Sequence, residues 1–93
     1  MRAALTPRQR RLARHALGLP NATNRSFRNR YVVAVAHRDY DDWCAMVDRE
    51  MADCGVVHRT TSHDYMRRFW LTRAGAQAAL DPNETLCPED FPV

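Results

Sequence analysis

Apolar residues recur at helical spacing near the start of the chain, in a stretch that is otherwise rich in arginine. Between residues 7 and 17, Leu12 and Ala16 fall on one face of a helix and arginines fall on the opposite face. Thr6 can cap this stretch at its start and Gly18 can end it, because threonine accepts bonds from free backbone amides and glycine tolerates a left-handed turn. We therefore predict a first helix over residues 7–17.

A second helical pattern begins after Asp39, which can cap it, and continues to about Asp53, with Gly55 as its stop. Its apolar side chains, among them Trp43 and Met51, cover one arc, so this side is predicted to pack on the core. Acidic residues lie on the opposite arc and form an exposed outer face. That face contains Asp41, Asp42, Asp48 and Asp53.

Short runs of β-branched and aromatic residues predict three strands, over residues 30–35, 56–59 and 68–71. The polar stretch 60–66 predicts a hairpin loop between the last two strands. A threonine then caps a third, alanine-rich helix over residues 73–80. These elements predict an α+β fold with three helices and a short antiparallel sheet.

The remaining segments are rich in residues that break regular structure. Residues 19–30 read as a loop, and residues 81–93 read as an extended tail pinned by Leu86 and Phe91. We therefore expect a single domain over residues 1–80, followed by an acidic, proline-containing tail. The predicted core consists of Leu12, Val33, Val35, Trp43, Val47, Met51, Val57, Phe69, Leu71 and Leu80.

Charge is divided unevenly along the chain. Residues 1–38 contain nine arginines and no acid, for a charge of +9, whereas residues 39–93 contain five arginines and eleven acids, for a charge of −6. The sum is the net charge of +3, so a modest total hides a strong asymmetry. Either the basic half meets an anionic partner, or the two halves pair with each other.

The basic half supplies the first function hypothesis, a non-catalytic module that binds DNA or RNA mainly through phosphates. Phe27 lies between two arginines of the loop and could stack on an unpaired base. The alternative is a solvated helix face and a loop whose arginines pair with the acidic tail. The candidate residues are Arg8, Arg10, Arg11, Arg14, Arg25, Phe27, Arg28 and Arg30.

Patterns for other kinds of chemistry are weak. Cys54, His58 and His63 are three possible metal ligands in a short stretch, but the chain has none of the closely spaced Cys or His pairs typical of zinc sites. The three glycines are scattered and neither serine has flanking glycines, which argues against a phosphate loop or a nucleophile elbow. We expect no catalytic site, no metal and no cofactor.

The longest apolar run is far shorter than the roughly 20 residues that span a bilayer, and the start of the chain has no signal-peptide core. These features favour a cytoplasmic protein that makes no membrane contact. The odd number of cysteines then indicates reduced thiols rather than disulfides.

The stretch MVDREMADCGVVHRTTSHDYMRRFWLTRAGAQAAL resembles the end of a winged-helix domain of the MarR type. The resemblance implies a winged-helix-like fold and DNA binding, with the helix before the wing in the major groove. Two departures count against that mode of binding. The helix before the wing is acidic and would be repelled by phosphates, and the usual additional helix ahead of it is replaced by a loop and a strand.

The segments LTPRQRRLARHALGLPN, RSFRNRYV, FWLTRAGA and ETLCPEDFP also resemble short, uncharacterised phage and prophage proteins. That resemblance raises an alternative function, a protein-interaction module that inhibits a host defence complex, as anti-CRISPR proteins do. Self-association into a homodimer through opposite charges is a further possibility. The protein-contacting residues would then be Asp41, Asp42, Asp48 and Asp53.

Overall fold

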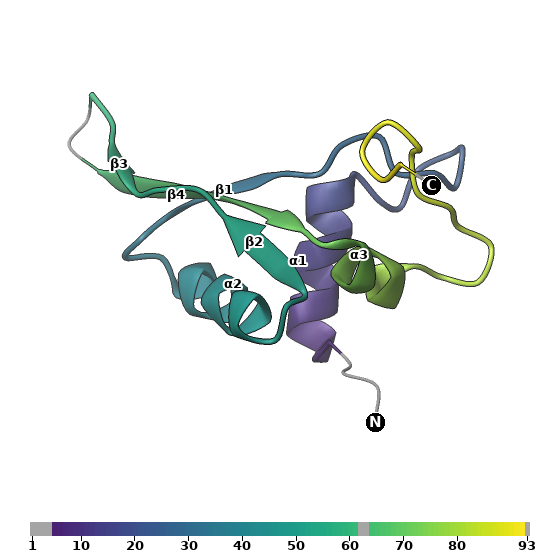
Figure 1. Ribbon diagram of the computed structural model, residues 1–93, viewed down its shortest axis with the longest axis horizontal. Helices are drawn as coiled ribbons and strands as arrows, with labels where there is room; N and C mark the ends of the chain where they lie inside the picture. The colour runs from purple at the N-terminus through teal and green to yellow at the C-terminus, as the bar shows by residue number, and fades with distance from the viewer. Residues whose placement is uncertain (1–4, 62–63, 93) are drawn as a thin grey trace.

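A computed structural model describes residues 5–61 and 64–92, and it shows an α+β arrangement of three helices and one antiparallel sheet (Figure 1). The predicted fold class is confirmed at this level. The elements in chain order are α1 (Pro7–Leu17), β1 (Tyr31–Ala34), α2 (Arg38–Asp48), β2 (Ala52–Cys54), β3 (His58–Arg59), β4 (Tyr65–Leu71) and α3 (Arg73–Ala79).

The first helix has the predicted boundaries, because both of its ends are fixed by local hydrogen bonds. The Thr6 hydroxyl accepts a bond from the Gln9 amide at 3.1 Å, and the Gln9 side chain accepts one from the Thr6 amide at 3.1 Å. At the other end Gly18 adopts a φ of +82°, which lets its amide bond back to the last turn of α1. Residues within four positions of one another therefore determine this helix.

Strand β4 is the centre of the sheet, with β1 on one side and β2 and β3 on the other. Phe69 lies opposite both Tyr31 of β1 and Cys54 of β2. Successive side chains of β4 alternate between the two faces of the sheet, so Phe69 points into the core while Arg68 is exposed on the opposite face.

One hydrophobic cluster joins all three helices to the Phe69 face of the sheet. At its centre the Trp43 ring stacks on Phe69, with ring centroids 5.5 Å apart. The core prediction is confirmed for Leu12, Val33, Trp43, Met51, Phe69 and Leu71. Val35, Val47 and Leu80 are only partly buried.

Val57 was predicted in the core, and this is wrong, because its residue is 41% exposed. It precedes β3, and the β3–β4 hairpin projects beyond the helices (Figure 1). Val57 therefore lies outside the core, where it lines a hollow and stays in contact with solvent.

The second helix was predicted to run to Asp53, but it ends at Asp48. Glu50 adopts a left-handed φ of +61°, and the chain then reverses into β2, where Asp53 lies opposite Trp70 of β4. Pairing with a strand distant in sequence therefore overrides the helical pattern. Asp39 was predicted to cap the start of α2, but the cap is His37. Its ring nitrogen Nδ1 accepts a hydrogen bond from the Asp39 amide at 3.0 Å.

The hairpin also differs from its prediction. Strand β4 begins at Tyr65, not at residue 68, and β3 covers only residues 58–59. Met66 belongs to the strand because it pairs with Ala34 of β1 and His58 of β3. Two residues of the predicted loop, Ser62 and His63, lie outside the described residues.

The acidic segment after α3 packs against α1 and the loop before β1. Phe91 is buried in the hydrophobic core. Thr85 forms a parallel bridge with Arg25, and the Cys87 amide donates to the Ser26 hydroxyl at 2.8 Å. The two halves of opposite charge are therefore in contact.

Candidate nucleic-acid interface

Two of the candidate arginines on α1 are neutralised by neighbouring carboxylates. Arg8 bonds to Asp39 at 3.0 Å and to Asp42 at 2.6 Å, and Arg10 forms an ion pair with Asp81. Burial of the Asp39 carboxyl acts to raise its pKa, but hydrogen bonds from Tyr31 and Arg8 together keep that pKa below its usual value. These two arginines already have anionic partners within the fold.

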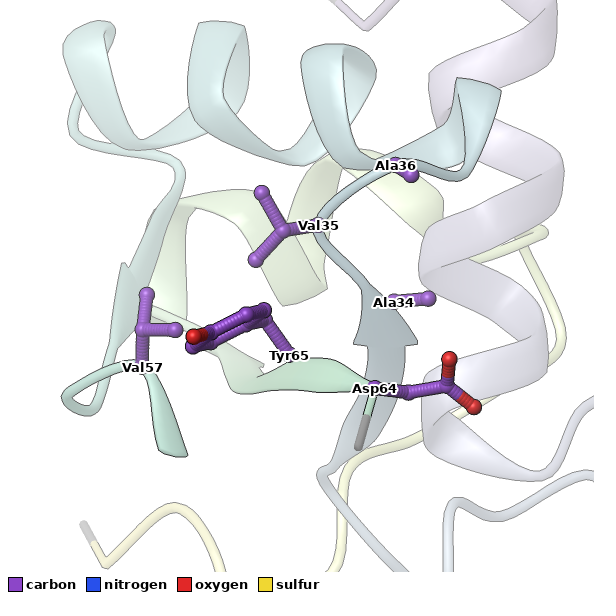
Figure 2. A pocket seen from close by; sticks show the side chains of 6 residues that line it. All are labelled: Ala34, Val35, Ala36, Val57, Asp64 and Tyr65. Atoms are coloured by element: carbon purple, nitrogen blue, oxygen red, sulfur yellow. The ribbon is translucent and has the colours of Figure 1, made fainter. Parts of the chain in front are cut away.

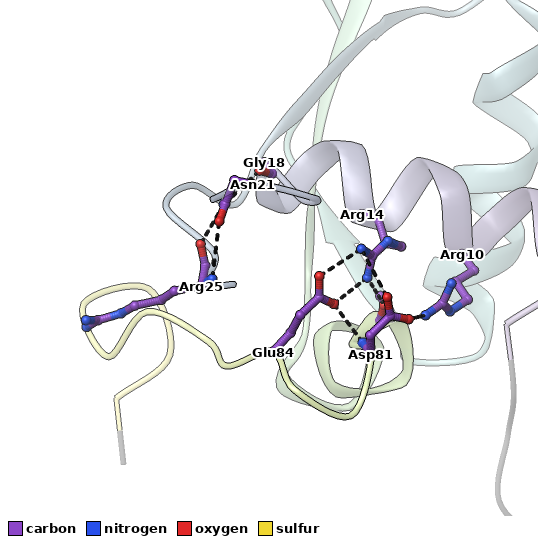
Figure 3. Close-up of polar contacts among 8 residues, drawn as sticks. Arg10, Arg14, Gly18, Asn21, Arg25, Asp81 and Glu84 are labelled. Carbon is purple, nitrogen blue, oxygen red and sulfur yellow. Dashed lines mark hydrogen bonds and ion pairs between the residues drawn. The ribbon is translucent and has the colours of Figure 1, made fainter. Parts of the chain in front are cut away.

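Arg14 makes the most enclosed ion pair of the described residues. Its guanidinium forms two bonds to Glu84, at 2.5 and 2.8 Å (Figure 3). A third bond goes to the Ala79 carbonyl at 3.0 Å. The side chains of Arg14 and Glu84 are only 12% and 3% exposed. The bonds from Arg14 lower the pKa of Glu84 to about 2, against the opposing effect of burial.

The prediction that Arg14 lies on the outer side of the first helix is wrong. Helical periodicity placed it opposite the apolar stripe, but the turn after α3 covers that side and brings Glu84 onto it. Asp81 of the same turn bonds Arg10 (Figure 3). Charge pairing between the halves therefore accounts for Arg8, Arg10 and Arg14.

Four other candidate arginines have no carboxylate partner within the described residues: Arg11, Arg25, Arg28 and Arg30. They follow the exposed side of α1 and the loop that leads into β1. The exposed His15 lines one hollow together with Arg28 and Arg30. We call the set Arg11, His15, Arg25, Phe27, Arg28 and Arg30 the loop–helix surface.

The loop–helix surface is held in place by backbone and ring contacts. Phe27 is 63% exposed, yet the edge of its ring lies so close to Gly18 that an added Cβ would be 2.2 Å from it. Arg28 lies over the Phe27 ring, 5.2 Å from its centroid, and donates to the His15 carbonyl at 2.7 Å. An aromatic ring and a guanidinium are thus presented together at the end of α1.

Asn21 shapes the loop at the other end of this surface. Its side-chain amide donates to the carbonyls of Gly18, at 3.1 Å, and of Arg25, at 2.8 Å. The Arg25 side chain extends away from the Arg14–Glu84 pair and into solvent (Figure 3). A short polar turn therefore leaves the Arg25 charge free for an external anion.

Comparison with known proteins identifies no relative. No known protein family, curated protein or solved structure matches the chain. The assignment of a function therefore depends on the chain's own residues. Among the described residues, no helix has the length and apolar character needed to cross a membrane.

The acidic candidates are spread over two elements. Asp41 and Asp48 are exposed on α2, whereas Asp42 is paired with Arg8 and Asp53 lies on β2. In the part of the chain that is described, no three Cys, His, Asp or Glu side chains gather as a metal site would require. His63, one of the three possible ligands considered from the sequence, is outside that part.

Sequence reasoning missed two surface features. One is a hollow of about 410 Å³ beside the hairpin, where Val35, Val57 and Tyr65 form an apolar lining (Figure 2). The other is the pair of exposed or partly exposed side chains Arg68 and Trp70 on β4. The period-two alternation within the predicted strand 68–71 already places Arg68 and Trp70 on one face, which is the signal that could have indicated the second feature.

Proposed function

We propose that this protein binds nucleic acid through the loop–helix surface, chiefly by contacts from its arginines to phosphates. The main support for the proposal is that carboxylates within the fold pair with some of the candidate arginines and not with others. Carboxylates neutralise Arg8, Arg10 and Arg14, yet no carboxylate among the described residues pairs with Arg11, Arg25, Arg28 or Arg30. Of these four, Arg28 lies over the exposed Phe27 ring. Arginine forks suit phosphate oxygens, and the faces of aromatic rings suit bases.

A winged-helix-like classification is part of this proposal. The strand order β1-β4-β2 with a projecting hairpin supports it. Only one helix, α2, lies between β1 and the hairpin, and its outer side exposes Asp41 and Asp48. We therefore assign the nucleic-acid contacts to the loop–helix surface rather than to the helix before the wing.

Binding should weaken steeply as salt rises. Four arginine–phosphate contacts give a slope of log affinity against log salt of about −2.8 on a single strand and about −3.6 on duplex DNA. Replacing Arg25 and Arg30 with alanine should make that slope shallower by about 1.5, because two contacts are lost. Fluorescence anisotropy with labelled strands over a salt series measures both values.

The matched control is the double variant Arg38→Ala and Arg49→Ala. It removes the same charge from exposed arginines at the two ends of α2, outside the loop–helix surface. Its salt slope should stay within about 0.5 of the wild-type slope. Absence of binding by the wild type at low salt would contradict the proposal, as would equal losses in the two double variants.

A second candidate function is self-association, or contact with a basic host protein, through opposite charges. Exposed Asp41 and Asp48 on α2 support it, because neither has an ion-pair partner among the described residues. If copies associate in this way, sedimentation should show a dimer at low salt that dissociates as screening increases. A monomeric mass at every salt concentration would exclude self-association.

A further inference from the structure

In the described part of the chain, no helix lies on the face of the sheet opposite the core. The buried side chains of all three helices join the cluster that contains Phe69, so the helices lie on the Phe69 side. On the other side β1 and β4 present Val32 directly opposite Arg68, with Trp70 two residues further along β4. We call Val32, Arg68 and Trp70 the outer sheet face.

The outer sheet face holds an aromatic ring and a guanidinium in contact. The Arg68 guanidinium lies over the Trp70 ring, 5.5 Å from its centroid. The indole extends toward Gly55, where an added Cβ would lie 3.9 Å from the ring, an ordinary contact distance. Arg68 is exposed and has no carboxylate partner among the described residues.

This face continues into the loop–helix surface. Arg30 and Val32 are two residues apart at the start of β1, and both line the hollow that also contains Arg28. Val32 is 50% exposed and lies opposite Arg68. Asp53 of β2 lies opposite Trp70 and bounds the outer sheet face on the side away from β1. The two surfaces together therefore present an aromatic ring, basic side chains, an apolar side chain, a further basic side chain and a second aromatic ring. These are Phe27, Arg28 and Arg30, Val32, Arg68 and Trp70.

Resting on the proposed function, we infer that the ligand is single-stranded nucleic acid, and that an unpaired base stacks on the Arg68–Trp70 pair while its backbone follows Arg28 and Arg30. Flat rings and guanidinium planes contact the faces of bases, and a duplex hides those faces inside its stack. Among the described residues no helix lies on the outer sheet face, so this face offers no helix for insertion into a major groove.

The test compares one labelled single strand with the same strand annealed into a duplex, at a fixed low salt concentration. The wild type should bind the single strand about fivefold more tightly or better, since one stacked base contributes that much. Trp70→Ala should abolish this preference by weakening single-strand binding about fivefold or more, with duplex affinity unchanged. Trp70→Phe retains a ring and should retain most of the preference.

Tyr65→Ala is the matched control. It removes another exposed aromatic ring from β4, but one that lines the hollow beside the hairpin on the opposite face. Its binding to both strands should equal that of the wild type. Intrinsic fluorescence gives an independent readout, because Trp43 is fully buried and only Trp70 can be quenched by a base. Quenching by the single strand should disappear in Trp70→Phe while the Trp43 emission persists.

The outcomes separate this inference from the proposed function. If neither strand binds the wild type at low salt, the proposed function itself fails. If both strands bind equally, or if Trp70→Ala weakens both to the same degree, nucleic-acid binding stands and the stacking site is overturned. A Trp70→Ala variant that binds both strands normally but shows an altered sedimentation mass would identify the outer sheet face as a contact between copies of the protein, which also overturns the inference.

Discussion

Replacing Arg14 with methionine is expected to lower the free energy of unfolding by about 3 kcal/mol, because it leaves the Glu84 carboxylate buried without its cation. In a domain of this size that loss lowers the melting temperature by roughly 15 °C. The Arg14 side chain also donates to the Ala79 carbonyl, so the end of α3 loses a bond as well. Denaturant unfolding followed by circular dichroism measures the change.

The double variant Arg14→Met and Glu84→Gln should recover most of the loss, because no charge then remains buried. The carbonyl oxygen of the introduced glutamine would still accept the bond that the Asp81 amide now donates to Glu84 at 2.7 Å. Arg11→Met, at an exposed position of the same helix, should change stability by no more than about 0.5 kcal/mol. Equal effects of Arg11→Met and Arg14→Met would show that the pair contributes nothing specific.

Acid provides a second check on the same pair. The pKa of Glu84 lies at about 2 in the folded protein and at 4.5 without the pairing, so the unfolded chain binds the extra proton between these values. The contribution of Glu84, on the order of 3 kcal/mol, is fully present above pH 4.5 and is lost as the pH falls toward 2. The difference in stability between wild type and Glu84→Gln should shrink over that window; a difference independent of pH would contradict the pairing.

Replacing Gly75 with alanine should destabilise the protein by about 3 kcal/mol, although the same change stabilises most helices by up to about 1 kcal/mol. The added Cβ would lie 1.9 Å from the Met51 carbonyl oxygen. That carbonyl cannot move freely, because it accepts the Thr72 amide at 3.1 Å at the start of α3. Thermal unfolding measured by calorimetry gives the magnitude.

Gly55→Ala is the matched control, since the nearest atom to a Cβ at Gly55 is 3.9 Å away, an ordinary contact distance. It should alter stability by no more than about 1 kcal/mol. Comparing the two variants separates the effect of the clash with the Met51 carbonyl from the general effect of replacing a glycine. Similar melting temperatures for the two variants would mean that α3 does not pack as described.

The sequence predictions are accurate where an element is determined by residues close together in the chain, and they fail where distant segments decide it. The second helix illustrates a failure: the apolar periodicity of residues 39–53 was correct for Trp43 and Met51, which are both buried, but not for the helix end. The spacing of apolar residues is the same whether Met51 lies on the helix or in a turn after it, so this spacing does not locate the helix end. Pairing of Ala52 with Leu71 decided between them, and one sequence does not reveal that pairing.

The candidate site was only partly predictable for the same reason. Its arginines and Phe27 stand out in the sequence, but their availability depends on carboxylates about 70 residues away, as in the bonds from Arg10 to Asp81 and from Arg14 to Glu84. Arg68 and Trp70 both lie in the predicted strand 68–71, but the sequence did not show that their side of the sheet faces away from the helices. Which face of β4 they share became evident only from the register with β1.

The sequence by itself determined the first helix, the α+β class and the asymmetry of charge, because capping bonds, side-chain periodicity and composition act within a few residues. Only the tertiary structure decided where the second helix ends and which side of the sheet is uncovered. It also decided which arginines are neutralised and which remain for a ligand. Those outcomes depend on strand pairing and ion pairs between distant segments, and the folded arrangement alone brings these segments together.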